Sequence, residues 1–439
     1  MCIARRIPRH RWLARLLAGL LVGGCAGPTR VPPIGAGQEG RSFVPDRDEA
    51  QLWRRSAEEE HKLQTSGALY EDPLLAAYLD RLALKLAPAT LQEAAAVHLQ
   101  IHVLDDPSLN AFSYPTGGVY VHTGLLARLE TEAQLATVLG HEIMHIHGRH
   151  LLQAHRSSHR KAVGTTIAGI AGSLVLAGAA GHRAGTGHAT QAYVINQVGN
   201  IMLHLGLTLG LEAAVNGFGR RLEREADRGA VQLLEAAGYD LREAPKVFHL
   251  LQEDYGDSHK IETFFYGSHP SNHQRELQFQ EWLEGADAEA AAEEERTVDT
   301  EEFHLRTRSM LRDNAEMNLA AARLGTAAAD LKKVLGMTPN DPVAQFLMGE
   351  VHRRRAERTD VPREAAREEE QALASYRKAA DLDPGYPEPW RAIGLIHYER
   401  REQAAALTAF RKYLDLAPAG APERKRVRDY ILELEAAGP

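Results

Sequence analysis

The sequence predicts an α+β protein, in which a mainly helical domain with a small sheet is followed by an all-α repeat domain. Three observations support this fold class. Apolar residues recur at helical spacing from Leu75 to Leu86, apolar and polar residues alternate from Val97 to Val103, and Pro384 and Pro418 stand 34 residues apart in the C-terminal part. With 439 residues, the chain is long enough for two or three domains.

The composition argues against nucleic-acid binding and against cysteine-based structure. The 51 lysines and arginines stand against 59 aspartates and glutamates, a net charge of −8, so we expect no nucleic-acid partner. The only cysteines are Cys2 and Cys25, which are too few for a disulfide framework or for a zinc site built from thiolates.

Residues 1–24 are typical of a signal peptide. Five arginines precede a short apolar core, Leu16–Val22, and two glycines follow at the cleavage point. The run Leu21-Val22-Gly23-Gly24-Cys25 resembles a bacterial lipobox, which implies that Cys25 is lipidated as the first residue of the mature protein. The alternative is a plain secretory signal with an incidental cysteine.

The residues after Cys25 bear on where the protein is anchored. Ala26 follows, and not an aspartate, so the resemblance favours the periplasm, with the lipid in the inner leaflet of the outer membrane. Residues 25–45 are rich in Pro and Gly and are predicted to form a flexible tether.

The first globular domain is predicted to span residues 46–284. A helix from Pro73 to Leu86 precedes a strand from Val97 to Leu104. A turn with a proline and paired glycines then leads into a second strand at Val119, Tyr120 and Val121. We expect this second strand to lie at the edge of the sheet and to pair with an extended peptide substrate.

A metal-binding pattern lies in the helix predicted after these strands. The helix begins at Thr131 with a capping box to Gln134, and it contains His141-Glu142-Ile143-Met144-His145. Residues four apart lie on one helical face, so both histidines can bind one metal ion while Glu142 flanks it.

A zinc site of this kind needs a third protein ligand and an open position for water. Glu223 and Asp227 are four residues apart on a second predicted helix, whereas Glu225 points away from them. We assign Glu223 to the metal and expect Asp227 to accept a hydrogen bond from the other nitrogen of a ligand histidine. Taken alone, this acidic cluster would fit a solvated helix surface better than a metal site.

Together these motifs resemble the M48 family of metallopeptidases, over roughly residues 65–280. The resemblance rests on Asn110-Ala111-Phe112, on the H-E-x-x-H-x-x-x-R-H of residues 141–150, on the E-x-E-A-D of residues 223–227 and on Gly238-Tyr239-Asp240. It implies a zincin-like fold, one Zn²⁺ per chain held by His141, His145 and Glu223, and Glu142 as the catalytic base.

The resemblance also draws attention to Ser268-His269-Pro270 and Arg275. It implies that His269 can occupy the open zinc position and hold the enzyme latent, although a structural turn histidine fits the sequence as well. His269 and Arg275 are both candidates for the donor that stabilises the tetrahedral oxyanion.

An apolar region separates the two ligand segments. The stretches 162–181 and 189–211 contain no Asp, Glu, Lys or Arg. We expect residues 162–211 to form a lid or insertion over the cleft, because their glycines and polar side chains suit lipid poorly; membrane insertion is the alternative.

The C-terminal part is predicted to consist of an acidic linker, residues 285–302, and a tetratricopeptide-repeat domain, residues 303–439. Trp390, Ile393, Gly394, Ala406 and Phe410 fall on positions of the 34-residue pattern, and Gly349 and Tyr376 fit the preceding unit. Such repeats stack into a solenoid whose concave surface binds partner proteins. The alternative is a helical cap that only stabilises the peptidase.

The motifs therefore predict a zinc metalloendopeptidase, and the resemblances imply that it works in the bacterial periplasm on misfolded or stalled envelope and outer-membrane proteins. The resemblance implies that the repeats recruit proteins of outer-membrane assembly. The alternative is a mostly latent peptidase that serves as a chaperone-like scaffold. The expected partners are peptide or protein substrates, assembly proteins, and the membrane through the lipid on Cys25.

Overall fold

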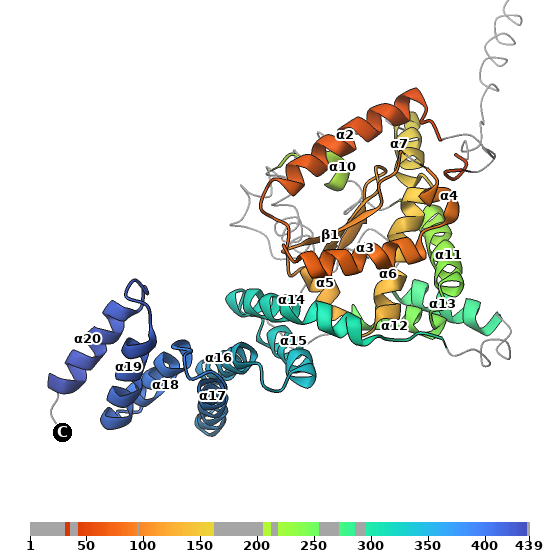
Figure 1. Ribbon diagram of the computed structural model, residues 1–439. Coiled ribbons are helices and arrows are strands. Elements are labelled where there is room, and N and C mark those ends of the chain that lie inside the picture. Colours follow the sequence, from red (N-terminus) through yellow and green to blue (C-terminus); the bar gives the residue numbers. More distant parts are fainter. Residues whose placement is uncertain are drawn as a thin grey trace, which may run out of the picture.

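The computed structural model describes residues 31–35, 43–94, 96–161, 205–211, 218–253, 272–285 and 296–436. The predicted signal peptide, Cys25, His269 and most of the stretch 162–211 lie outside these residues. The described part is mainly helical with one small sheet, which confirms the α+β class. A first domain holds the sheet, and a row of helices extends away from it (Figure 1).

The first domain places helices on several sides of its sheet (Figure 1). Its elements are α2 (Arg47–Gln64), α3 (Pro73–Leu86), α4 (Ala89–Gln92), β1 (Gln100–Leu104), β2 (Ala111–Ser113), β3 (Gly118–His122), α5 (Thr123–Arg128), α6 (Glu132–His147), α7 (His150–Lys161), α10 (Thr208–Leu211), α11 (Arg220–Ala236), η2 (Leu241–Glu243), α12 (Ala244–Leu250) and α13 (Asn272–Gly285).

The sheet has the order β1-β3-β2, with β1 parallel and β2 antiparallel to β3. The prediction that Val119, Tyr120 and Val121 form an edge strand is therefore wrong, because β3 pairs on both sides and is buried throughout. The edge next to α6 belongs to β2, a strand of only three residues. The sequence shows the hairpin but not that β1 joins it in parallel on the other side.

Helix α6 is buried almost along its whole length, between the sheet and α11. The predicted capping box is confirmed in part: the Thr131 hydroxyl accepts a hydrogen bond from the Gln134 amide at 3.3 Å, but the Gln134 side chain accepts from the Glu130 amide at 2.8 Å and not from that of Thr131. Two more amides of its first turn are capped from the interdomain linker: Glu132 donates to the Asp299 carboxylate at 3.1 Å and Ala133 to the Val298 carbonyl at 3.0 Å. Such caps satisfy the free amides of a helix N-terminus.

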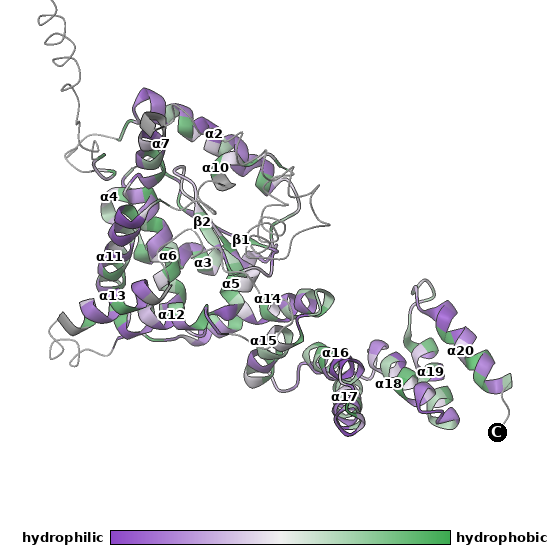
Figure 2. Cartoon of the chain, turned by 180° about the vertical axis from the view of Figure 1, so that it is seen from behind, coloured by the Kyte–Doolittle hydropathy of each residue, from purple (hydrophilic) through white to green (hydrophobic). Residues whose placement is uncertain are grey.

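The C-terminal part consists of consecutive helices that pack pairwise. They are α14 (Glu301–Ala320), α15 (Leu324–Met337), α16 (Pro342–Arg358), α17 (Pro362–Leu382), α18 (Glu388–Glu399), α19 (Gln403–Leu416) and α20 (Arg424–Ala436). Figure 2 shows apolar and polar residues interspersed along each of them, as amphipathic packing requires. The residues inserted before Pro384 lengthen the pair α16–α17, in which α17 alone has 21 residues.

The first helix pair of this part packs directly on the first domain. The Lys333 ammonium on α15 donates hydrogen bonds to the carbonyls of Ala127, Arg128 and Leu129, at the end of α5. Buried apolar residues form one continuous cluster from α3 to α19. Within the described ranges, no helix combines the length and the apolar character needed to cross a bilayer.

Candidate metal centre

His141, His145 and Glu223 form the centre of the site, as the sequence predicts. One ligand atom from each lies within 4.8 Å of the other two, and all three side chains are buried. The Nε2 atoms of the two histidines are 2.9 Å apart, and the Glu223 Oε2 atom lies 3.4 Å from His141 Nε2 and 3.7 Å from His145 Nε2. Two imidazole nitrogens and one carboxylate oxygen that converge in this way fit zinc.

Asp227 lies behind the first histidine, on the same face of α11 as Glu223. Its Oδ1 atom is 2.9 Å from His141 Nδ1 and can accept a hydrogen bond from the N–H there. This arrangement leaves Nε2 of His141 free for a metal. Burial raises the pKa of Asp227, but the Arg275 guanidinium and the His141 ring outweigh this effect and hold it below its usual value. The carboxylate is therefore ionised at neutral pH.

Arg275 on α13 contacts both Asp227 and His141. It lies on the Nδ1 side of the His141 ring, away from the Nε2 atom that faces the metal site. Its Nε atom donates to Asp227 Oδ2 at 2.9 Å, and its Nη2 atom contacts both Asp227 Oδ1 and His141 Nδ1. The guanidinium lies over the Phe248 ring at 4.8 Å and is buried. This placement argues against Arg275 as the oxyanion donor, because it is bound on the opposite side of the His141 ring.

His150 has the corresponding place behind the second histidine. Its Nδ1 atom lies 2.8 Å from His145 Nδ1, so His145 can donate a proton there while its Nε2 faces the metal site. Burial lowers the pKa of His150 to about 3, which keeps the ring neutral and able to accept. The H-E-x-x-H spacing does not reveal this role of His150, although His150 closes the H-E-x-x-H-x-x-x-R-H motif.

The turn that brings His150 to this position depends on Arg149. Arg149 has a left-handed backbone, with φ at 54°, directly after the end of α6. Its guanidinium donates from Nε to the Glu49 carboxylate on α2 at 2.7 Å and from Nη1 to the Pro32 carbonyl at 3.2 Å. These contacts offset the cost of a conformation that residues other than glycine rarely adopt.

Glu142 lies beside the ligands with its carboxylate held by the edge strand. The Ser113 hydroxyl donates to Glu142 Oε2 at 2.9 Å. Burial raises the pKa of Glu142 to about 7, against the effect of the His141 ring. A carboxylate with a pKa near neutrality can both take up and release a proton, as a general base needs.

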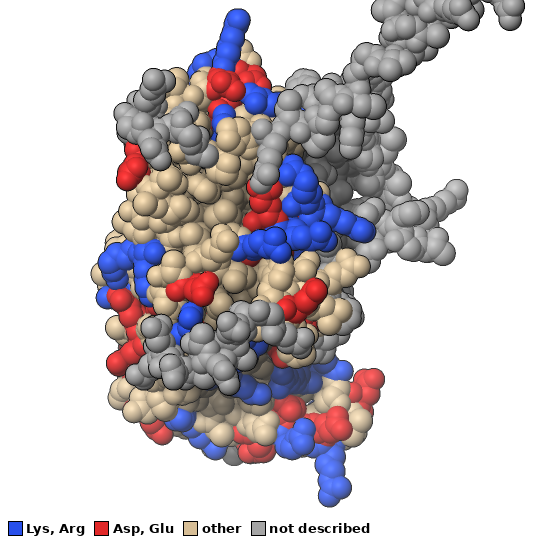
Figure 3. All heavy atoms as spheres, turned by 90° about the vertical axis from the view of Figure 1, so that its right-hand side faces the viewer, with Lys and Arg blue, Asp and Glu red and all other residues tan. Residues whose placement is uncertain are grey.

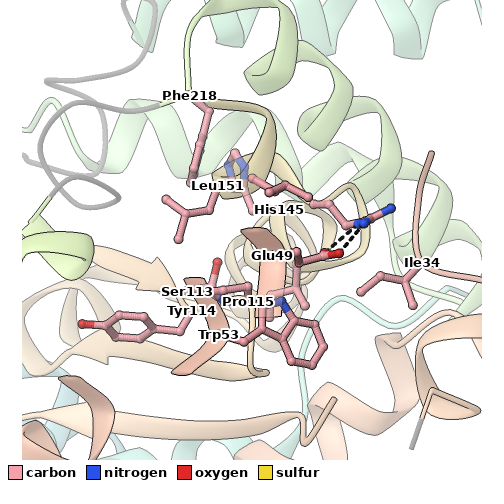
Figure 4. A pocket seen from close by; sticks show the side chains of 12 residues that line it. Ile34, Glu49, Trp53, Ser113, Tyr114, Pro115, His145, Leu151 and Phe218 are labelled. Atoms are coloured by element: carbon pink, nitrogen blue, oxygen red, sulfur yellow. Dashed lines mark hydrogen bonds and ion pairs between the residues drawn. The ribbon is translucent and has the colours of Figure 1, made fainter. Parts of the chain in front are cut away.

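The described residues around His145 leave little open space. A cavity of about 10 Å³, room for one water molecule, lies between α2, β2, α7 and Phe218 (Figure 4). The Phe218 ring packs on His145 at 4.3 Å, and its amide donates to Glu223 Oε1 at 3.1 Å. Helix α2 contributes Glu49 and Trp53 to the same cavity. Among the described residues, this side of His145 therefore offers room for about one water molecule.

Comparisons with known proteins agree with this geometry. The chain is 31% identical to the beta-barrel assembly-enhancing protease of Escherichia coli (strain K12) over 186 residues, which are 42% of this chain and 34% of that protein. It is 28% identical to the protein of the same name from Yersinia pestis over 255 residues, 55% of this chain and 47% of that one.

A further relative is the mitochondrial metalloendopeptidase OMA1 of Schizosaccharomyces pombe, 30% identical over 184 residues, 42% of this chain and 46% of that one. The chain spans less than half the length of each of these relatives. Residues 73–283 match peptidase family M48, a segment that includes Glu142 and every residue of the His141-His145-Glu223 cluster. This part of the chain is an M48 peptidase domain.

Proposed function

We propose that the chain is a zinc metalloendopeptidase. The observation that carries this proposal is the buried convergence of His141, His145 and Glu223 with Glu142 beside them, inside an M48 domain. When bound, zinc supplies a Lewis acid that makes water nucleophilic near neutral pH and polarises the scissile carbonyl. Glu142 takes up the proton of the attacking water on its carboxylate and gives it to the leaving amine.

The substrate is proposed to be an extended peptide that pairs with β2. This strand, Ala111–Ser113, is hydrogen-bonded to β3 on one side and lies along α6. A peptide added there through its backbone would pass Glu142, to which Ser113 is bound. Because all three residues of β2 are buried, a neighbouring segment has to move before the peptide can bind.

We further propose that the protein acts in the periplasm, anchored to the outer membrane by a lipid on Cys25. Its substrates would be misfolded or stalled envelope proteins, in keeping with the names of its relatives from Escherichia coli and Yersinia pestis. The helix pairs of α14 to α20 would act as tetratricopeptide repeats that bind outer-membrane assembly proteins.

A second candidate is a latent peptidase that works mainly as a scaffold. The small cavity beside His145 favours it, since the described residues there leave room for about one water molecule. His269 would then be the residue that keeps the site shut. Under this hypothesis the wild-type protein binds zinc and partners but cleaves little.

One set of variants tests both candidates. We expect Glu142→Gln to retain zinc and to lose at least about 100-fold in casein cleavage, because the general base is gone. The control Glu225→Gln changes a half-buried residue of α11 outside the metal cluster and keeps both zinc and activity. Cleavage by Glu142→Gln at the wild-type rate would refute the assignment. Inactive wild type with active His269→Ala would support latency, and zinc-bound but inactive protein throughout would favour the scaffold.

A further inference from the structure

A row of arginines runs along α11 on the side away from the metal ligands. Arg220, Arg224 and Arg228 recur every fourth residue, so they lie on one helical face with a spacing of about 6 Å along the axis. All three are exposed, whereas Glu223 and Asp227 on the same helix are buried. One helix thus carries metal-site residues on its inner face and a basic row on its outer face.

Folding does not account for this row. Positive side chains at the start of a helix oppose the macrodipole, and like charges four residues apart repel each other. Among the described residues, Arg220 and Arg224 make no ion pair, and Arg228 lies over the Trp282 ring at 5.5 Å. Arg221 is the exception, because it pairs with Glu225 at 3.2 Å. A row of exposed guanidinium groups forms a positively charged surface that suits an anionic ligand.

The row borders an open cleft of about 750 Å³. Its described charged lining consists of four arginines, Arg220, Arg221, Arg224 and Arg228, and one acid, Glu225. The cleft also contacts the end of α6 through Met144, His147 and Gly148. Figure 3, which looks at the side of the molecule that carries α11, shows basic side chains gathered there in one cluster. The cluster is local, since the whole chain is acidic.

The cleft is separate from the proposed substrate path. Its described lining includes neither β2 nor Glu142 nor any of the three metal ligands. A peptide bound along β2 would not pass through the cleft. The ligand of the cleft therefore differs from the stretch of substrate that is cleaved.

The N-terminal tether leads to the same cleft. Pro33 is part of the cleft wall, and the next residue, Ile34, donates its amide to the His147 carbonyl at 2.9 Å. Cys25 precedes Pro33 by eight residues, so a fully extended chain places it at most about 29 Å away. A lipid on Cys25 would thus hold this face close to a membrane.

We propose that the arginine row and its cleft dock on the phosphates of anionic phospholipids at the membrane surface. Guanidinium groups bind phosphate oxygens through paired hydrogen bonds, and a basic patch next to a lipid chain strengthens membrane attachment. Docking would fix the orientation of the peptidase relative to the membrane. The proposal does not require peptidase activity.

The test is sedimentation of the full chain with vesicles, in a Cys25→Ser background that prevents lipidation. The Cys25→Ser protein with its arginine row intact is expected to bind vesicles of phosphatidylcholine mixed with phosphatidylglycerol at low salt and to lose this binding at high salt. It should not bind vesicles of pure phosphatidylcholine. Each basic residue near an anionic surface contributes roughly a five-fold factor, so Arg220→Gln/Arg224→Gln/Arg228→Gln should weaken binding on the order of 100-fold. The corresponding triple lysine variant keeps most of the binding.

Matched variants separate the row from net charge and from misfolding. Arg363→Gln/Arg377→Gln/Lys378→Gln on α17 removes the same charge from exposed positions and should leave binding unchanged. The double variant Arg220→Gln/Arg224→Gln spares the contact with Trp282 and should still lose about 25-fold.

Three results would overturn the proposal. The first is equal binding of wild type to neutral and anionic vesicles, and the second is equal loss in the α11 and α17 variants. The third is unchanged vesicle binding by the α11 variants together with a raised KM for peptides with acidic flanks, which would assign the cleft to the substrate.

Discussion

At the scale of single residues, each ligand histidine is oriented by a partner at its Nδ1 atom, on the side of the ring away from the metal site. Asp227 faces Nδ1 of His141 and His150 faces Nδ1 of His145, each within 2.9 Å. The two supports differ chemically, because Asp227 is a buried carboxylate that needs the Arg275 charge, whereas His150 is neutral. The role of Asp227 can therefore be tested by removing its charge.

We expect Asp227→Asn to lower zinc affinity about 10- to 100-fold, because the His141 ring loses the acceptor that fixes its tautomer. The variant also leaves the Arg275 guanidinium buried without its carboxylate, which should reduce the free energy of unfolding by about 3–5 kcal/mol. Chelator competition and urea unfolding measure the two effects. Glu225→Gln on the same helix should change neither quantity. Wild-type zinc affinity in Asp227→Asn would show that the carboxylate does not orient the ring.

The sequence predicts the residues of this site only where they share one helix. His141 with His145, and Glu223 with Asp227, follow from a spacing of four residues. Arg275 lies 48 residues beyond Asp227 on another helix, and its contact depends on how α13 packs. The sequence therefore cannot distinguish a role of Arg275 as oxyanion donor from one as a support of Asp227.

At the scale of elements, helix pairs in the C-terminal part meet through glycines and aromatic rings. A Cβ atom on Gly394 of α18 would lie 2.4 Å from the Phe410 ring of α19, and one on Gly349 of α16 would lie 2.4 Å from the Tyr376 ring of α17. These are the glycine and aromatic positions that the repeat pattern predicts. Small residues facing rings thus set the close approach of each pair.

We expect Gly394→Ala to destabilise the protein by about 1–3 kcal/mol, because the added methyl group collides with the Phe410 ring. Gly336→Ala on α15 is the control, since a Cβ atom there meets no atom within 4 Å. The control should be neutral or should gain up to about 1 kcal/mol from helix propensity. Thermal or urea unfolding compares the two. Equal effects of both substitutions would mean that the α18–α19 contact is looser than described.

The sheet marks the limit of prediction at this scale. The alternation of Val97–Val103 and the hairpin before β3 are visible in the sequence, but strand order is not. A three-residue strand such as β2 has too few positions to show a period. The sequence therefore favours the longer β3 as the edge strand, whereas the structure places β3 in the centre.

At the scale of the whole molecule, the peptidase domain and the first C-terminal helix pair are packed as one unit. The Tyr70 hydroxyl donates to Asp313 at 2.7 Å, and the Lys333 ammonium reaches three carbonyls at the end of α5. The linker also caps the first turn of α6, the helix that carries His141 and His145. These contacts join residues more than 160 positions apart, so no local sequence pattern predicts them. The interdomain contacts thus extend to the helix that carries His141 and His145.

The same junction contains a buried carboxylate that makes stability depend on pH. Asp330 on α15 accepts hydrogen bonds from the amide groups of Asn314 at 2.8 Å and Asn318 at 3.2 Å. Burial raises its pKa to about 6, although Lys333 acts in the opposite direction. A raised folded-state pKa means that the protonated form is favoured by folding. The resulting stabilisation is complete below the unfolded pKa, near 3.9, and is lost as the pH rises through about 6.

We therefore expect Asp330→Asn to be more stable than wild type by about 1–3 kcal/mol at pH 8 and equal to it near pH 4, because the neutral amide avoids the cost of a buried charge. Urea unfolding across this pH range measures the difference between the two proteins, which cancels the titration of all other groups. Asp381→Asn, at an exposed position of α17, should stay parallel to wild type throughout. If Asp330→Asn were less stable at pH 8, the ionised carboxylate would be needed to hold Lys333 at the junction, and the charge would stabilise the domain contact.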